Sequence, residues 1–238
     1  GGAGGAGPIM PVCSPDVPRV VPLQAWAEPD AGQAPFVDAL STATSSIRVM
    51  VYQMGYGQIL DTLKSKAMSG VSVRVILDVS QIDTNQKYFD QLTAAGAEVE
   101  WSDTAFSYMH AKALVVDDAI AVISTGNYLA TEMAKERNYV ARDDDPADVQ
   151  SLAALFDADW AKVSPDLSCT RLVVSPVNSR DRIVGLVDEA QSTLDIESMQ
   201  LADTDVRNAV VARKNAGVTV RVLLADAGWI DANTSAAA

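Results

Sequence analysis

Stretches of strand-like and helix-like hydrophobic spacing alternate along the chain. Strands are predicted where β-forming apolar residues cluster, over residues 47–54, 71–77 and 97–101. Helical spacing occupies the segments before and between them, over residues 34–45, 57–69 and 84–95. Gly70 and Gly96 follow the last two helices, where glycine commonly ends a helix. Strands that alternate with helices predict an α/β fold with a mixed or parallel sheet.

A β-hairpin is predicted around Asp117-Asp118, because two adjacent Asp residues suit a turn and residues 119–123 can return as the partner strand. A two-residue turn pairs residue 116 with residue 119. The acidic run that follows, residues 143–148, lacks the regular spacing of a calcium site. We therefore interpret it as a solvated loop whose Asp residues cap a helix near 147–162.

The first strand of the hairpin contains His110 and Lys112, which alternate with alanines and so point to the same side. Continuing the predicted pairing places Thr125 directly across from His110. Asn127 lies two residues on, on the same face as Thr125. The pattern gathers an imidazole, an ammonium, a hydroxyl and an amide around one point, a set that suits a phosphate ester.

Part of the first half of the chain recurs with an offset of 147 residues. Gly-Val-Ser-Val-Arg-Val-Ile-Leu at 70–77 matches Gly-Val-Thr-Val-Arg-Val-Leu-Leu at 217–224, and 217 − 70 gives that offset. At the same offset Gln53 meets Gln200. We interpret the chain as one complete lobe followed by the first half of a second copy. The expected organisation is a flexible N-terminal segment, a first lobe and a truncated second lobe, over residues 1–18, 19–162 and 163–238.

Composition adds a charge and a redox argument. No apolar run is long enough to span a bilayer. A net charge of −13 disfavours a nucleic-acid partner, because phosphate backbones usually require clustered Lys and Arg. The two cysteines, Cys13 and Cys169, form one disulfide in an oxidising compartment or remain unpaired thiols. A disulfide would favour a secreted or periplasmic protein, and the glycine-rich start suits a processed terminus.

The segment from His110 onwards resembles the signature of the phospholipase D superfamily, His-x-Lys-x4-Asp-x6-Gly-Ser-x-Asn. The matching positions in this sequence are His110, Lys112, Asp117, Thr125 and Asn127. Thr125 stands for the usual Ser and keeps the hydroxyl, while Ser124 replaces the usual Gly. The resemblance covers nearly the whole chain beyond its first 18 residues or so. It implies a phospholipase D-like lobe, a mixed β-sheet flanked by helices, with a partial second repeat.

This resemblance implies chemistry at a phosphodiester, with His110, Lys112 and Asp117 as the catalytic residues. A neutral His110 would attack phosphorus and form a phosphohistidine, while Lys112 neutralises the non-bridging oxygens. Thr125 and Asn127 would donate hydrogen bonds to the substrate. Asp117 would pair with a catalytic imidazole or fix the geometry of the hairpin. Neither a cofactor nor a metal is expected.

Two features depart from a complete site of this family. The family often places a carboxylate eleven residues past the Asn to orient the nucleophile, and Asn138 stands there, with Glu136 or Glu132 as substitutes. The family also brings two such motifs together, one from each lobe or subunit. His110 is the only histidine, so the second half-site is expected from a continuation of the chain or from a second chain.

The leading hypothesis is a phospholipase D-like phosphodiesterase with a phospholipid substrate, which catalyses hydrolysis or transfer to an alcohol. One alternative is an endonuclease of the same superfamily, for which the acidic charge makes nucleic acid a less favoured partner. The other is a catalytically inactive module that binds phosphate. Gln53 and the loop 102–109 are candidates for the lining of the cleft, although ordinary structural roles suit them equally.

Overall fold

The computed structural model describes residues 21–234, which form two compact units that divide between Leu172 and Val173. The predicted flexible segment 1–18 lies outside the described residues. Cys13 lies outside them as well, so its disulfide with Cys169 stays a prediction. Within the described part of the chain, no helix has the length and apolar character needed to cross a membrane.

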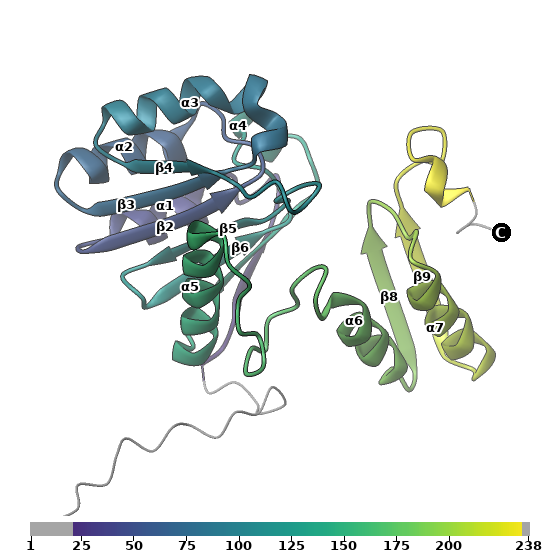
Figure 1. The fold of residues 1–238 in the computed structure, drawn as a ribbon. Helices are drawn as coiled ribbons and strands as arrows, with labels where there is room; N and C mark the ends of the chain where they lie inside the picture. Colours follow the sequence, from purple (N-terminus) through teal and green to yellow (C-terminus); the bar gives the residue numbers. More distant parts are fainter. Residues whose placement is uncertain (1–20, 235–238) are drawn as a thin grey trace, which may run out of the picture. The chain divides into compact units, whose positions relative to one another are not determined.

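A seven-stranded sheet forms the centre of the first unit (Figure 1). Its spatial order is β1-β7-β6-β5-β2-β3-β4. The strands are β1 (Gln24–Ala27), β2 (Ser46–Val51), β3 (Ser72–Leu77), β4 (Glu98–Trp101), β5 (Lys112–Val116), β6 (Ile120–Ser124) and β7 (Tyr139–Asp143). Strands β2, β3 and β4 run parallel, whereas every other neighbouring pair is antiparallel. The predicted α/β lobe with a mixed sheet is confirmed.

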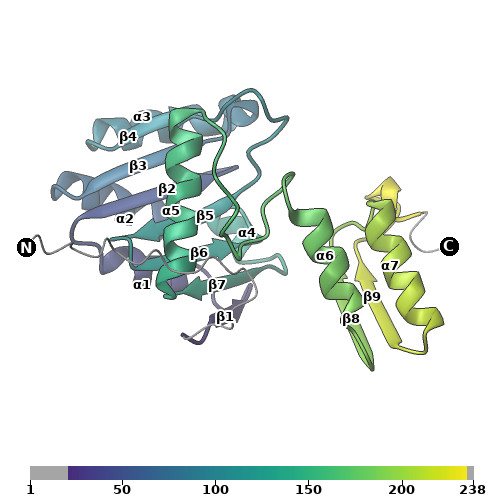
Figure 2. The ribbon, with the colours of Figure 1, turned by 60° about the horizontal axis from the view of Figure 1, so that its bottom comes forward.

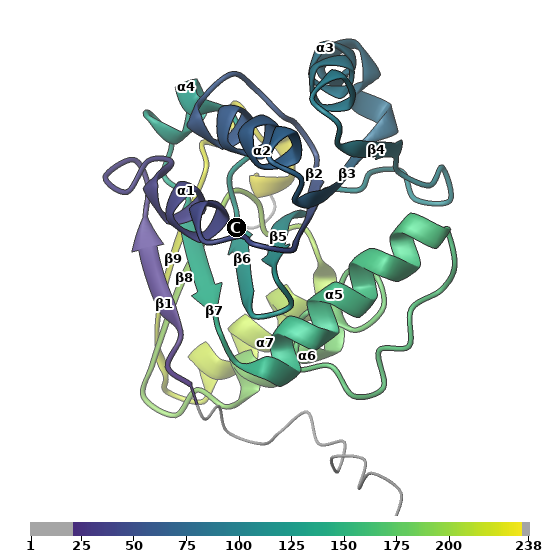
Figure 3. The ribbon, with the colours of Figure 1, turned by 90° about the vertical axis from the view of Figure 1, so that its left-hand side faces the viewer.

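Helices cover both faces of this sheet. Figure 2 shows α5 lying across one face, and Figure 3 shows α1 and α2 on the other side of the strands. The helices of the first unit are α1 (Ala34–Ser41), α2 (Gln58–Met68), η1 (Val79–Gln81), α3 (Ile82–Ala94), α4 (Ala130–Met133) and α5 (Pro146–Ala161), of which η1 is a 3₁₀ turn.

The central strands are buried on both faces, so each contributes to two apolar cores. One core joins alternate strand residues to α1, α2 and α3, and includes Phe36, Val49, Leu63, Val75, Leu92 and Leu114. The other joins the intervening strand residues to α5, and includes Met50, Ile76, Ala113, Val115, Leu152 and Phe156. Strands enclosed in this way read as continuous apolar runs. Burial of each Val, Leu, Ile, Met or Phe side chain in these cores contributes about 1.5–3 kcal/mol to folding.

The helix ends follow local hydrogen bonding. Gly70 and Gly96 have φ of 91° and 95°, as expected of glycines that end helices. The helix predicted over 34–45 stops earlier, at Ser41. The hydroxyl of Thr42 donates to the carbonyl of Ala39 at 2.7 Å, which caps the last turn. Residues 42–45, which were predicted to be helical, form the loop that leads into β2.

The hairpin turn lies where it was predicted, but the register of its strands differs by one residue. Asp117 and Asp118 have φ of 51° and 53°, the left-handed conformation that a tight hairpin turn requires. Ala119 donates to the carbonyl of Val116 at 2.9 Å and closes the turn. Val116 then pairs with Ile120 rather than with residue 119. A shift of one residue moves the following side chains to the opposite face of the sheet.

Helix α5 is held by carboxylates at its start, as predicted. The expectation that the acidic run is solvated is wrong, because Asp143, Asp145 and Asp148 are buried. Asp145 is the N-cap and accepts from the backbone N–H of Ala147 at 3.0 Å. Arg171 forms ion pairs with Asp145 at 2.8 Å and with Asp148 at 2.9 Å. Leu172 packs against the core under α5. These contacts explain why the first unit extends through Leu172.

The second unit is a smaller α/β element. Its elements are α6 (Ser179–Asp188), β8 (Thr193–Ser198), α7 (Thr204–Asn215), β9 (Thr219–Leu224) and the 3₁₀ turn η2 (Asp231–Asn233). Strands β8 and β9 pair in parallel, with Thr193 opposite Thr219. In the first unit Ser46 lies opposite Ser72. The two pairs therefore share one register at one offset, because 193 − 46 and 219 − 72 are both 147.

Candidate active site

Strand ends gather the candidate residues at one edge of the first sheet. The parallel strands β2, β3 and β4 all end at this edge, which we call the site edge. Strand β5 is antiparallel to β2 and begins there, with Lys112 opposite Val51. Strand β6 returns to the same edge and ends at Ser124. Loops at the carboxyl ends of parallel strands are common places for ligand sites.

His110 and Lys112 form a close pair at the site edge. Lys112 Nζ lies 2.9 Å from His110 Nδ1 and donates to the main-chain oxygen of His110 at 2.8 Å. The Lys112 side chain is buried, with 5% of its surface exposed, whereas His110 is exposed. As an ammonium, Lys112 donates to Nδ1 and leaves Nε2 as the ring nitrogen without a hydrogen bond to a described residue.

Burial and mutual repulsion make both groups weaker bases than usual. Burial lowers the pKa of His110, the charge of Lys112 lowers it further, and the charge of Asp78 partly opposes these effects. Burial also lowers the pKa of Lys112 to about 8, although Glu132 and Asp78 act in the opposite direction. Near neutral pH the pair therefore consists of a neutral imidazole and an ammonium. A nucleophile beside a cation is the combination that attack on a phosphodiester requires.

Asn127 contributes an amide to the same edge. Its Nδ2 donates to Gln53 Oε1 and to Glu132 Oε2, both at 3.3 Å. Its Oδ1 is buried and accepts no hydrogen bond from a described residue. Burial raises the pKa of Glu132, while the hydrogen bond from Asn127 lowers it. Glu132, named from the sequence as a substitute carboxylate, therefore acts on Asn127 and Lys112.

A chain of hydrogen-bonded side chains extends from Asn127 across the strand ends. Gln53 Nε2 donates to Gln81 Oε1 at 2.6 Å. Gln81 Nε2 in turn donates to the hydroxyl of Tyr52 at 2.8 Å. Gln53 thus lines the site edge as the sequence suggested. Tyr52 and Gln81 were not anticipated, although Tyr52 lies near the end of the predicted strand 47–54 and Gln81 follows the predicted strand 71–77.

Asp78 organises the loop that leads to His110. It accepts from Ser102 Oγ at 3.4 Å and from the backbone N–H of Met109, so it holds both ends of loop 102–109. The carboxylate is 1% exposed. Between these anchors the loop exposes the aromatic side chains of Phe106 and Tyr108. Sequence reasoning missed Asp78, which looks like an ordinary strand end.

Thr125 and Asn138 contact each other at the site edge and make no hydrogen bond to His110. Thr125 Oγ1 donates to Asn138 Oδ1 at 2.9 Å and accepts from the backbone N–H of Tyr139 at 2.9 Å. A Cβ at Gly126 would lie 2.9 Å from Asn138 Cγ, so the close approach of Asn138 requires glycine there. The expectation that Thr125 lies across from His110 is wrong, because the hairpin register is shifted by one residue.

Asp117 lies at the opposite end of β5 from His110. The five residues of β5, a stretch of roughly 16 Å, and Ala111 lie between them. The Asp117 carboxylate accepts five hydrogen bonds, from the backbone N–H groups of Thr44, Ser45 and Ser46 and from the hydroxyls of Thr44 and Ser45. Burial alone would raise its pKa, but these donors hold the pKa well below its usual range. Of the two expected roles, this geometry fits the one that fixes the hairpin.

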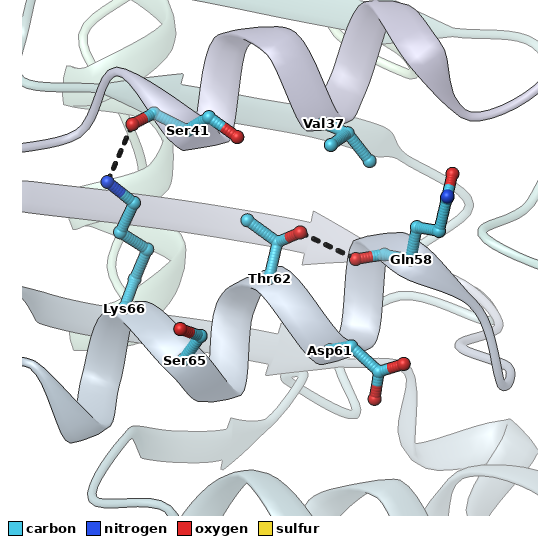
Figure 4. A pocket seen from close by; sticks show the side chains of 7 residues that line it. All are labelled: Val37, Ser41, Gln58, Asp61, Thr62, Ser65 and Lys66. Atoms are coloured by element: carbon cyan, nitrogen blue, oxygen red, sulfur yellow. Dashed lines mark hydrogen bonds between the residues drawn. The ribbon is translucent and has the colours of Figure 1, made fainter.

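A surface hollow elsewhere in the first unit is unrelated to this cluster. It is a shallow groove of about 530 Å³ between α1 and α2 (Figure 4). Its lysine, Lys66, donates to the main-chain oxygens of Ser41 and Ala43 at 2.7 and 2.8 Å. The ammonium of Lys66 therefore caps the carboxyl end of α1 and is not directed at a ligand. Across residues 21–234, no three His, Cys, Asp or Glu side chains are grouped so that they could hold a metal ion.

Comparison with known proteins gives one consistent family. A family model described as cardiolipin synthase, PLD-like domain matches residues 36–160, which is more than half of the chain. The mitochondrial cardiolipin hydrolase of Chlamydomonas reinhardtii is 27% identical over 125 residues, or 52% of this chain and 56% of that protein. The chain thus spans little more than half the length of this relative.

Solved structures show the same fold. A phospholipase D family member, Nuc from Salmonella typhimurium, aligns with a TM-score of 0.55 and 19% identity over 61% of this chain and 97% of that one. Polyphosphate kinase from Porphyromonas gingivalis aligns with a TM-score of 0.71 and 19% identity over 85% of this chain and 34% of that one. At these identities the likeness concerns the architecture.

Proposed function

Because the chain belongs to the phospholipase D superfamily, we propose that it is a phosphodiesterase in which His110 is the nucleophile. The observation that carries the proposal is the His110–Lys112 pair, with Nζ 2.9 Å from Nδ1 at the site edge. A nucleophilic imidazole and a cation for the phosphate lie together there. Asn127, in the loop after β6, supplies an amide from a second segment.

The proposed reaction begins when a phosphodiester approaches the exposed imidazole. Its non-bridging oxygens attract the Lys112 ammonium away from Nδ1. The imidazole proton then exchanges through solvent from Nε2 to Nδ1, which frees the Nε2 lone pair. Nε2 attacks phosphorus, the bond from phosphorus to the leaving oxygen breaks, and a phosphohistidine remains. Water or an alcohol subsequently takes the phosphoryl group from His110 and releases it as the free imidazole.

A natural leaving group must be protonated as it departs, and His110 is the only histidine in the sequence. We therefore propose that a second half-site supplies the general acid, from a continuation of the polypeptide or from a second chain. The family's use of two motifs supports this arrangement. An activated substrate such as bis(p-nitrophenyl) phosphate avoids the requirement, because nitrophenolate leaves without being protonated.

We favour a phospholipid as the natural substrate. The net charge of −13 repels a nucleic-acid backbone, which usually binds to clustered Lys and Arg. The relative from Chlamydomonas reinhardtii is named a cardiolipin hydrolase, which supports a lipid phosphodiester. An exposed aromatic side chain beside the nucleophile, Tyr108, also suits the boundary between head groups and acyl chains.

The first test uses bis(p-nitrophenyl) phosphate, quenching in alkali and mass spectrometry of the protein. We expect a nitrophenyl phosphate adduct on residue 110 and a matching burst of nitrophenolate. His110→Ala should give neither, and Lys112→Met should slow the burst. Lys64→Met, on α2, is the matched control and should behave as wild type, because Lys64 pairs with Asp61 and contacts Gln91 of α3. An adduct at another residue, or turnover that survives His110→Ala, would overturn the assignment.

The second test separates the substrate classes. Vesicles that contain cardiolipin and single-stranded DNA are each incubated with the native protein, including any second half-site. Release of phosphatidic acid supports the phospholipid assignment. DNA cleavage without lipid turnover would replace it with the endonuclease. If inorganic phosphate perturbs the His110 NMR signal while neither substrate is cleaved, the protein is a phosphate-binding module.

A further inference from the structure

Tyr52 contacts both members of the His110–Lys112 pair. Its ring centroid lies 4.5 Å from that of His110, with the two planes inclined by 54°. The Lys112 Nζ lies 5.1 Å from the centroid of the same ring. The backbone N–H of Tyr52 also donates to the carbonyl of Ala111 at 3.0 Å, so the backbone fixes Tyr52 opposite the segment that carries both groups.

The Tyr52 ring is itself held in place from two further segments. Gln81, in η1 after β3, donates to its hydroxyl at 2.8 Å. Tyr108, in the loop before β5, packs edge-on against the ring with centroids 6.1 Å apart. A side chain restrained at its hydroxyl and at its ring keeps one rotamer. Such restraint is what a group needs if it is to orient others.

The hydroxyl of Tyr52 is also one end of the hydrogen-bonded chain through Gln81 and Gln53 to Asn127. Asn127 donates to Gln53, Gln53 to Gln81, and Gln81 to Tyr52, so every amide in the chain has a defined orientation. The chain ties together the ends of β2, β3 and β6. A substitution at Tyr52 should therefore alter the position of the Asn127 amide as well as that of the His110 imidazole.

Each member of the pair lacks a different restraint, which the Tyr52 ring supplies. Lys112 has a flexible four-carbon stem, and burial removes the water that would otherwise solvate its ammonium. An aromatic face partly replaces that water, through a cation–π interaction. His110 precedes the first residue of β5 and is exposed, so the sheet does not fix its ring. The ring of Tyr52 contacts both side chains and so supplies the restraint that each lacks.

We propose that Tyr52 is a positioning residue, whose ring holds the imidazole of His110 and the ammonium of Lys112 in their mutual orientation. The inference rests on the proposed function of the His110–Lys112 pair as nucleophile and phosphate-binding cation. It assigns no chemical step to Tyr52. The ring carries the role, and the hydroxyl keeps the ring in its rotamer through Gln81.

The test compares Tyr52→Phe, which keeps the ring, with Tyr52→Leu, which removes it. Tyr56→Leu is the matched control, because Tyr56 packs on Tyr88 and does not contact the pair. With bis(p-nitrophenyl) phosphate, Tyr52→Leu should lower kcat about tenfold or more, while KM changes by less than about threefold. Tyr52→Phe and Tyr56→Leu should both stay within about threefold of wild type. Equal losses of kcat in Tyr52→Phe and Tyr52→Leu would overturn the role of the ring.

A pH profile and an NMR measurement distinguish positioning from general destabilisation. Removal of the ring admits water, so Tyr52→Leu should move the alkaline limb of kcat/KM to higher pH, because burial no longer depresses the Lys112 pKa as strongly. In wild type, the single imidazole should show nuclear Overhauser contacts to a tyrosine ring that disappear in Tyr52→Leu. The proposal would be overturned if Tyr52→Leu kept both the alkaline limb of kcat/KM and the NMR signal of the imidazole unchanged.

The two measurements also separate this proposal from the proposed function. If wild type forms no adduct on His110, the phosphodiesterase assignment fails, while the imidazole contacts still decide whether Tyr52 orients the pair. If the adduct forms but Tyr52→Leu reacts like wild type, only the positioning role fails. If Tyr52→Leu does not fold, two other measurements test the proposal. Absence of the Overhauser contacts in wild type would contradict it, and so would loss of activity in Tyr52→Phe.

Discussion

Lys112 contacts His110 twice, through its ring nitrogen Nδ1 at 2.9 Å and through its main-chain oxygen at 2.8 Å. One ammonium therefore fixes the imidazole and also opposes its protonation. Burial lowers the pKa of His110, and the charge of Lys112 lowers it further. The pair behaves as a single unit, so a change to either residue should alter the titration of the other.

We predict that Lys112→Met raises the pKa of His110. The substitution keeps an apolar stem of similar length and removes the positive charge, so the imidazolium becomes easier to form. Because the sequence has a single histidine, one imidazole signal in the NMR spectrum reports the titration without assignment. Lys64→Met should leave that titration unchanged. A His110 pKa that stays constant or falls in Lys112→Met would contradict the coupling.

The pH dependence of kcat/KM for bis(p-nitrophenyl) phosphate should be bell-shaped. In the proposed reaction His110 attacks only as the neutral imidazole, so the rate should fall as pH decreases through its lowered pKa. Lys112 binds phosphate only as the ammonium, so the rate falls again as pH rises through about 8. Lys112→Arg should remove the alkaline limb, because a guanidinium stays charged. An alkaline limb that persists in this variant would show that another group titrates there.

Glu132 should determine where the alkaline limb lies. Its charge raises the pKa of Lys112, so Glu132→Gln should lower that pKa and move the limb to lower pH. Glu136→Gln is the matched control, since Glu136 does not contribute to the Lys112 pKa. Its alkaline limb should coincide with that of wild type. Equal displacement in both variants would mean that general surface charge, rather than Glu132, sets the limb.

The sequence predicts the site edge well because strand direction follows from the pattern of strands and helices. The β2 and β3 predictions place Gln53 at the edge where His110 enters, and the structure joins Gln53 to Asn127 there. Tyr52 and Gln81 were within reach of the same argument. The contacts of Tyr52 and Gln81 depend on where their side chains point after β2 and β3 have ended. The hydrophobic periodicity of a strand does not predict that direction.

The position of Thr125 could not be predicted because it depends on a single residue of register. The turn at Asp117-Asp118 was correct, but Ala119 closes the turn without joining the ladder, and pairing restarts at Ile120. Two-residue and three-residue connections differ little in sequence, and the difference reverses which face a side chain occupies. Local sequence thus predicted the turn, whereas packing of both faces of β6 determined the register.

Asp117 should be important for stability and not for the titration of His110. We predict that Asp117→Asn lowers the free energy of unfolding by about 2 kcal/mol near neutral pH, because charged hydrogen bonds to the loop before β2 are weakened. Its depressed folded-state pKa contributes stability above the unfolded carboxyl pKa of about 4, and the contribution is lost as pH falls towards the folded value. Denaturant unfolding at several pH values measures the difference.

Asp118→Asn is a closely matched control for that experiment. Asp118 adopts nearly the same φ as Asp117, and asparagine suits both positions. Its carboxylate is more exposed and pairs with Arg48 at the surface, so the loss should be below about 1 kcal/mol. Both variants should retain the wild-type titration of His110. A shifted His110 pKa in Asp117→Asn would instead support a direct catalytic role for Asp117.

The ion pairs of Arg171 should be a main source of stability where the first unit ends. Asp145 and Asp148 keep only 5% and 1% of their side-chain surface exposed, so loss of the guanidinium leaves buried charge poorly compensated. Arg171→Met should therefore lower the free energy of unfolding by about 3 kcal/mol. Arg180→Met removes an exposed pair with Asp203 and should lower the free energy of unfolding far less, because solvent screens that pair. Similar small losses in both variants would show that residues up to Leu172 are not an integral part of the first unit.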